Sequence, residues 1–136
     1  MQTGFAARAW PTRTTHHLVA RNATRVSRRR IVVDAENVRR SAWPNLSKVE
    51  LVERSRAWAE REGFDLLVVF DGPRPEDAPD LLGSGGRSAD DVIAELPAAF
   101  WLVTSDRALR ERVGDKAERV LGGGSFLREI ATVRPD

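Results

Sequence analysis

Short apolar runs alternate with amphipathic stretches along most of the chain. The runs at 31–33, 66–70, 100–103 and 119–121 are short and rich in β-branched or other large apolar residues, which predicts four strands. The run at 66–70 is apolar throughout, as is typical of a strand covered on both faces in a parallel sheet. We therefore expect a sheet that is buried between layers of helices.

Four helices are expected between and after these strands. The first begins at the capping box of residues 47–50 and ends at Gly63, and the second begins at Ser88 and stops at Pro97. The third closes at Gly114 and the fourth follows the glycines at 122–124. The residues that we expect on the buried faces are Leu51, Val52, Ser55, Trp58, Ala59, Val92, Ile93, Leu96, Leu109, Val113, Phe126, Leu127 and Ile130.

Strands that alternate with helices predict an α/β protein. We expect a three-layer, Rossmann-like fold with a central, mostly parallel sheet and right-handed crossovers. Residues 72–87 are rich in proline and glycine and predict a long irregular loop, with room for a small edge strand near Leu81 and Leu82. The glycines at 83–86 and 122–124 match no phosphate-binding or dinucleotide motif, so we interpret them as flexible connections.

The charge is distributed unevenly along the 136 residues, a length that indicates one domain. Residues 1–30 hold seven arginines and no acid, whereas the remainder holds 15 basic and 20 acidic side chains. We expect residues 1–29 to form a basic, disordered arm and residues 30–136 to form the folded domain. Such an arm favours contact with a phosphate backbone; a transit peptide or a mis-assigned start are the alternatives.

Composition excludes several kinds of chemistry. The chain has no cysteine, and its only histidines are His16 and His17, so disulfides and thiolate metal sites are excluded and a catalytic triad is disfavoured. No apolar run approaches the roughly 20 residues that span a bilayer, so we expect a cytoplasmic protein without a membrane partner. Carboxylates, arginines, hydroxyls and amides remain as the functional groups.

Aspartates follow the expected strands. Asp34 ends the first, Asp71 ends the second and Asp106 follows the third, while Asp90 and Asp91 begin the helix that precedes the third strand. The carboxyl ends of parallel strands meet at one edge, where such sheets place their sites. Each aspartate also suits a turn or a helix cap. Together, anions at one edge raise each other's pKa or bind cations, and oxygen ligands alone suit Mg²⁺ or Mn²⁺.

Four segments resemble, in order, the motifs of NYN domains, the PIN-like nucleases that include the YacP group. The resemblance spans about residues 30–130. Ala35 departs from it, because YacP-like members often have glycine there, and Glu36 adds an acid. The segments that carry the resemblance are Asp34-Ala35-Glu36-Asn37, Val69-Phe70-Asp71-Gly72, Ser88-Ala89-Asp90-Asp91 and Thr104-Ser105-Asp106-Arg107.

The resemblance implies a PIN-like fold and a metal-dependent endoribonuclease that hydrolyses RNA by metal-activated water. It implies Mg²⁺ or Mn²⁺ as cofactor, and Asn37 as the residue that orients a water or a phosphate. By matching position, the catalytic and metal-binding carboxylates would be Asp34, Asp90, Asp91 and Asp106, with Asp71 as a further candidate that a turn role alone would explain.

Further residues are candidates for contact with RNA. Arg74, Arg87 and Arg107 lie beside the acidic motifs and could bind phosphates, or they could be ordinary surface residues. Trp43 is a candidate for stacking on a base, whereas Trp58 and Trp101 are expected in the core. We expect Ser105 to act as a helix cap.

Two other functions stay open from the sequence. The first is a non-catalytic NYN-like module that binds RNA or a protein partner, and the second is a phosphatase or phosphotransferase. The segment Asp34-Ala35-Glu36 lacks the D-x-D pattern of an aspartyl-phosphate enzyme, which argues against the second. A homodimer or a protein partner, such as an antitoxin, is compatible with the sequence but not identified by it.

Overall fold

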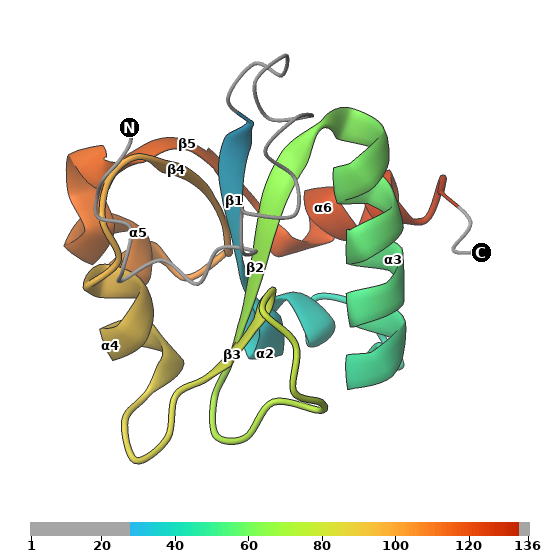
Figure 1. The fold of residues 1–136 in the computed structure, drawn as a ribbon, viewed down its shortest axis with the longest axis horizontal. Coiled ribbons are helices and arrows are strands. Elements are labelled where there is room, and N and C mark those ends of the chain that lie inside the picture. Colours follow the sequence, from blue (N-terminus) through green and yellow to red (C-terminus); the bar gives the residue numbers. More distant parts are fainter. Residues whose placement is uncertain (1–27, 134–136) are drawn as a thin grey trace, which may run out of the picture.

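A five-stranded, entirely parallel sheet forms the centre of the computed structural model, which describes residues 28–133 (Figure 1). The strands lie in the order β3-β2-β1-β4-β5, so the sheet prediction is confirmed. The short edge strand near Leu81 is also present. The strand bounds are β1 Arg29–Asp34, β2 Phe64–Phe70, β3 Leu81–Gly83, β4 Phe100–Val103 and β5 Ala117–Leu121.

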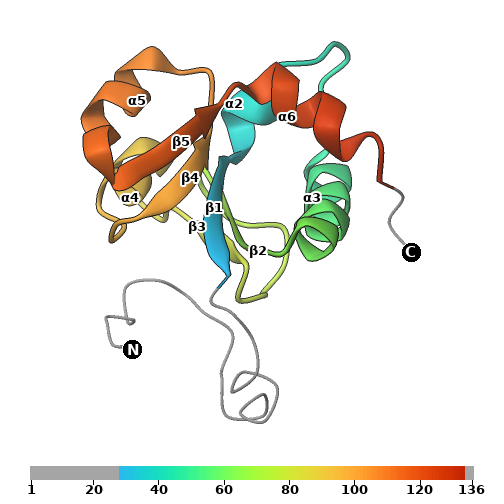
Figure 2. The same cartoon turned by 90° about the horizontal axis from the view of Figure 1, so that it is seen from above.

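Helices cover both faces of the sheet and complete three layers (Figure 2). Helices α2 (Ala35–Arg39), α3 (Lys48–Glu62) and α6 (Gly123–Ile130) pack on one face. Helices α4 (Ala89–Ala94) and α5 (Arg107–Val113) pack on the other, and a short 3₁₀ helix, η2 (Gly114–Lys116), leads into β5.

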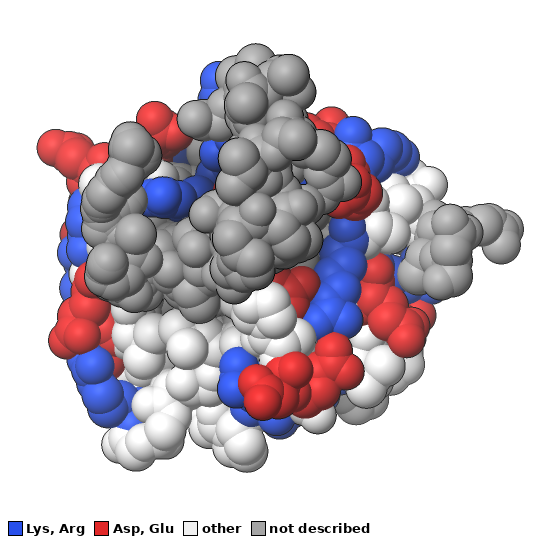
Figure 3. All heavy atoms as spheres, in the orientation of Figure 1, with Lys and Arg blue, Asp and Glu red and all other residues white. Residues whose placement is uncertain are grey.

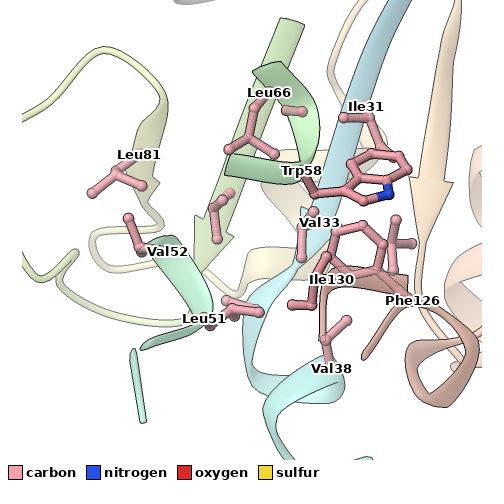
Figure 4. Close-up of a cluster of buried hydrophobic side chains, with 14 of the residues drawn as sticks. Ile31, Val33, Val38, Leu51, Val52, Trp58, Leu66, Leu81, Phe126 and Ile130 are labelled. Carbon is pink, nitrogen blue, oxygen red and sulfur yellow. The ribbon is translucent and has the colours of Figure 1, made fainter. Parts of the chain in front are cut away.

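The alternation of side chains along β1 divides the core in two. Ile31 and Val33 join a cluster that Trp58 of α3 and Phe126 of α6 complete (Figure 4). Val32 points to the opposite face, into a second cluster beneath α4 and α5. Ile31, Val32 and Val33 have no exposed surface, which explains why β1 is apolar on both faces over these residues.

The capping signals place the helices as expected. The Ser47 hydroxyl accepts a hydrogen bond of 3.0 Å from the Glu50 N–H at the start of α3, and Gly63 ends this helix with a φ of +80°. Ser88 caps α4 in the same way, accepting 3.1 Å from the Asp91 N–H. Helix α4 ends at Ala94, earlier than the stop expected at Pro97.

Two expectations were wrong or incomplete. Helix α2 directly follows β1 in a segment without a clear helical pattern. Gly123 and Gly124 are not a flexible connection but the first turn of α6. A Cβ added at Gly123 would lie 2.3 Å from Ser41 Oγ and 3.4 Å from Val38 Cα, so this glycine lets α6 approach α2 closely.

The expected basic arm falls mostly on residues 1–27, which lie outside the described residues, so the arm stays a prediction. Its last residue, Arg29, begins β1 and pairs with Phe64 of β2. Within residues 28–133 there is no helix with the length and apolar character needed to cross a bilayer.

Candidate functional site

The candidate site lies where the strand order of the sheet reverses. The chain builds β2 and β3 on one side of β1, and β4 and β5 on the other. In parallel α/β sheets, ligands bind beyond the carboxyl ends of the strands at this reversal. Asp34 ends β1 there, and Thr104 follows the end of β4 beside it.

Asp34 is the central side chain of the site. It is only 5% exposed, and its Oδ2 accepts a hydrogen bond of 2.8 Å from the Thr104 hydroxyl. Burial raises the pKa of this carboxyl to about 6; the Thr104 hydrogen bond opposes the shift, and the carboxylates of Asp90 and Asp106 add to it. A buried, strongly perturbed carboxyl at a reversal of strand order marks a functional candidate.

Asp90 and Asp106 approach Asp34 from two helices. Asp90 lies in the first turn of α4, and burial followed by the nearby Asp106 and Asp71 carboxylates raises its pKa. Asp106 caps α5, with Oδ1 accepting 3.1 Å from the Leu109 N–H, and its own N–H donates to Thr104 Oγ1. The cap that explains Asp106 locally also holds its carboxyl group at this edge of the sheet.

Asp91 and Asp71 lie at the margin of this group. The carboxylate of Asp91 pairs with Arg112 of α5 at 2.8 Å, and this hydrogen bond keeps the pKa of Asp91 below its ordinary value. Asp71 is exposed, and its carboxylate raises the pKa of Asp90 rather than that of Asp34. The structure thus brings together Asp34, Asp90 and Asp106, and it gives Asp91 a partner of its own.

Asn37 and Ser105 tie the elements of the site together. Asn37 Oδ1 accepts a hydrogen bond of 2.8 Å from the Ser105 N–H, which joins α2 to the segment after β4. The residue that caps α5 is Asp106 and not Ser105. The Ser105 hydroxyl instead accepts 2.8 Å from the Gly123 N–H in the first turn of α6, so it caps a different helix.

The carboxylates do not form a finished metal cage. Among residues 28–133, no group of three or more acidic or histidine side chains is placed to hold a metal ion. The carboxylates of Asp90 and Asp106 are nevertheless near enough to Asp34 to raise its pKa, and that of Asp106 also raises the pKa of Asp90. Oxygen ligands and a shared negative field suit a hard cation such as Mg²⁺, which is usually held by one or two carboxylates together with waters and substrate phosphates.

Two of the three arginines expected to contact RNA are engaged within the protein. Arg74 holds the loop after β2 through Asp77 at 2.7 Å and the Leu81 carbonyl at 2.9 Å. Arg87 forms a two-pronged pair with Glu95 at 2.9 and 2.5 Å. Arg107 is exposed and has no ion pair within the described part of the chain, 28–133.

The sequence reasoning missed the cations that face the acids. Arg40 lies close enough to Asp34 to lower the pKa of that carboxyl. Arg112 forms an ion pair with Asp91, and its charge also lowers the pKa of Asp90. No spacing rule in the sequence links these residues, because the contacts arise only when α2 and α5 are packed. Figure 3 shows that acidic and basic side chains are interspersed on the visible described surface of this face.

The fold and this edge define a three-layer, parallel α/β protein with an acidic site at its strand reversal. The fold is similar to that of Rae1 (YacP) from Bacillus subtilis, whose crystal structure, of a mutant form, superimposes with a TM-score of 0.59. The two sequences are 19% identical, and the match covers 76% of this chain and 74% of the other. No protein-family model and no curated protein matches the sequence.

Proposed function

We propose that this protein is a metal-dependent endoribonuclease with its active site at the Asp34 edge. The observation that carries the proposal is the buried Asp34 carboxyl, whose pKa is raised to about 6, in the field of Asp90 and Asp106. The YacP-like fold and the four motifs in the NYN order support RNA as the substrate.

The donor set fits a divalent cation of the Mg²⁺ or Mn²⁺ type. We assign Asp34 as one ligand and Asp90 or the second oxygen of Asp106 as another, and waters or an RNA phosphate would complete the coordination. When bound, such an ion supplies positive charge to a phosphoryl oxygen and makes a water molecule more acidic. Asp91 is left out of this set because Arg112 neutralises it.

The chain's own residues prepare the site before any ion binds. Thr104 holds the Asp34 carboxylate by one oxygen and leaves the other oxygen free to act as a ligand. Asn37 uses its carbonyl oxygen to hold Ser105, which leaves its amide N–H groups to donate to a phosphate or a water. We assign contact with the RNA backbone to Arg107, which is exposed and adjacent to Asp106 in the sequence.

The test is cleavage of an end-labelled RNA by the purified protein with Mn²⁺ or Mg²⁺, with and without EDTA. We expect cleavage that EDTA abolishes and that Asp34→Asn removes. Asp115→Asn is the matched control, because Asp115 is an exposed aspartate of η2. This short helix leads into the start of β5, so it lies at the amino ends of the strands, away from the candidate site. This variant should cleave like the wild type.

Two results would count against the proposal. Cleavage that survives both chelation and Asp34→Asn would assign the activity to another site or to a contaminant. RNA binding without cleavage, across several divalent metals, would instead assign the chain to the non-catalytic class of binding modules.

A further inference from the structure

Trp43 is a large aromatic side chain left almost entirely in solvent. It is 91% exposed, whereas Trp58 is 4% exposed and Trp101 packs against the core. The residue lies in the segment that joins α2 to α3, and this segment projects from the body of the molecule (Figure 2). Among residues 28–133, the other exposed large apolar side chain is Val49, which is 57% exposed.

The segment that carries Trp43 is fastened at its base. The Leu46 N–H donates 3.3 Å to the Arg39 carbonyl, and Arg39 Nε donates 2.7 Å back to the Leu46 carbonyl. Glu36 holds the same guanidinium through Oε1 at 2.5 Å. These bonds close the chain from Arg39 to Leu46 into a loop, which we call the clasped loop, and they present Trp43 from a fixed base.

Two cations flank the clasped loop at the edge of the sheet that holds the candidate site. Arg40, at its start, is close enough to Asp34 to lower the pKa of that carboxyl. Lys48, just after its end, places its ammonium 5.7 Å from the ring of Phe70, the last residue of β2. Trp43 therefore lies between two cations along the chain, and both cations contact or act on residues at the carboxyl ends of the strands.

We propose that Trp43 is a base-stacking platform for single-stranded RNA that enters the Asp34 edge. The inference rests on the proposed function, because it takes RNA as the ligand. An exposed aromatic ring flanked by cations is the pattern with which proteins bind unpaired nucleotides: the ring stacks on a base while the cations bind the neighbouring phosphates. Holding the base of the clasped loop in advance lowers the entropy lost on binding.

The test compares the affinity of the full chain for two RNAs in EDTA, which separates binding from cleavage. One is a fluorescein-labelled single-stranded 12-mer, and the other has the same backbone with abasic positions. We expect Trp43→Ala to weaken binding of the normal RNA by roughly 5- to 150-fold, and to leave binding of the abasic RNA unchanged. The unfolding midpoint should not move, because the ring is exposed.

Two further variants separate stacking from a general loss of apolar surface. Trp43→Phe keeps an aromatic ring and should retain most of the affinity, whereas Val49→Ala removes a neighbouring exposed apolar side chain and should have no effect. In a separate cleavage assay with Mn²⁺, Trp43→Ala should raise KM and leave kcat nearly unchanged, because stacking binds the substrate and the transition state equally.

The possible failures are distinguishable. If Trp43→Ala binds both RNAs like the wild type, the stacking inference is wrong even where cleavage is observed, and Trp43 then becomes a candidate contact for a protein. If the wild type binds RNA in a Trp43-dependent way but never cleaves it, the inference holds and the nuclease proposal fails. If the wild type binds neither RNA in EDTA, the stacking inference is wrong, and the cleavage assay with Mn²⁺ decides the nuclease proposal separately.

Discussion

Thr104 donates a hydrogen bond from Oγ1 to Asp34 Oδ2 at 2.8 Å, and this bond crosses from the residue after β4 to the last residue of β1. Both side chains are buried. The bond stabilises the charged form of a carboxyl that burial would otherwise neutralise. It therefore keeps an anion in place at the point where the strand order reverses.

Removing this hydroxyl should cost stability mainly when Asp34 is charged. We expect Thr104→Val to lower the free energy of unfolding by about 1.5–3 kcal/mol at pH 8, as for a hydrogen bond to a charged group, and by less at pH 4. Urea unfolding at the two pH values measures both quantities. Thr104→Ser keeps the hydroxyl and should lose less at pH 8; equal losses for the two variants would show that packing, not the hydrogen bond, dominates.

Neutralising Asp34 should stabilise the fold. The pKa of this carboxyl is about 6 in the folded chain, against an ordinary value of 3.8. Its contribution to the stability of the fold is therefore fully present below pH 3.8 and is lost as the pH rises through about 6. This difference in pKa corresponds to about 3 kcal/mol by which the ionised Asp34 destabilises the fold at pH 8. Asp34→Asn should therefore be more stable than the wild type at pH 8, and this advantage should shrink towards pH 4.

The same urea unfolding series decides the outcome for Asp34→Asn. A variant that is less stable than the wild type at pH 8, or an advantage that does not change with pH, would mean that the native site does not hold Asp34 in a strained, ionised state. Functional sites commonly lower the stability of a fold in this way, because their function requires a charged group.

Asp90 and Asp91 should differ sharply in their importance, although they are neighbours in the sequence. Asp90 lies in the field of Asp34 and Asp106, whereas Asp91 is bound to Arg112. We expect Asp90→Asn to reduce Mn²⁺-dependent cleavage on the order of 100-fold or more, and Asp91→Asn to reduce it by about tenfold or less. Initial rates at saturating Mn²⁺ measure both, and the reverse order would place the cation on Asp91.

The two glycines that begin α6 should respond in opposite ways to alanine. A Cβ at Gly123 would collide with Ser41 and approach Val38, so Gly123→Ala should destabilise the protein by about 1–3 kcal/mol. A Cβ at Gly124 meets only Arg128 Nη1, at 3.8 Å, so Gly124→Ala should be neutral or stabilise by up to about 1 kcal/mol. Thermal or urea unfolding tests this pair, and equal effects would refute the close packing of α6 on α2.

The sequence predicted features that depend on neighbours along the chain. The apolar runs located the strands, the capping boxes located α3 and α4, and the rule for parallel sheets placed Asp34 and Asp106 at one edge. It did not predict α2, because Ala35–Arg39 is too short to show a helical period. The glycines at 122–124 looked flexible because their role depends on how closely two helices pack.

The partners of the charged side chains were the least predictable part. The pairs Asp91–Arg112 and Arg87–Glu95 form only when the helices or loops are packed, and each removes a residue that the motifs had made a candidate. Glu36, an acid outside the expected pattern, holds Arg39 at the base of the clasped loop. The long-range packing of the fold decides these pairings, and residue spacing alone does not indicate them.

The most direct measurement is the anomalous signal of Mn²⁺ in crystals of the full chain soaked with the ion, compared between the wild type and Asp34→Asn. We expect a peak within bonding distance of Asp34 and at least one of Asp90 and Asp106, and no such peak in the variant. A peak elsewhere, or none at millimolar Mn²⁺, would contradict the assignment of this edge as a metal-dependent nuclease site.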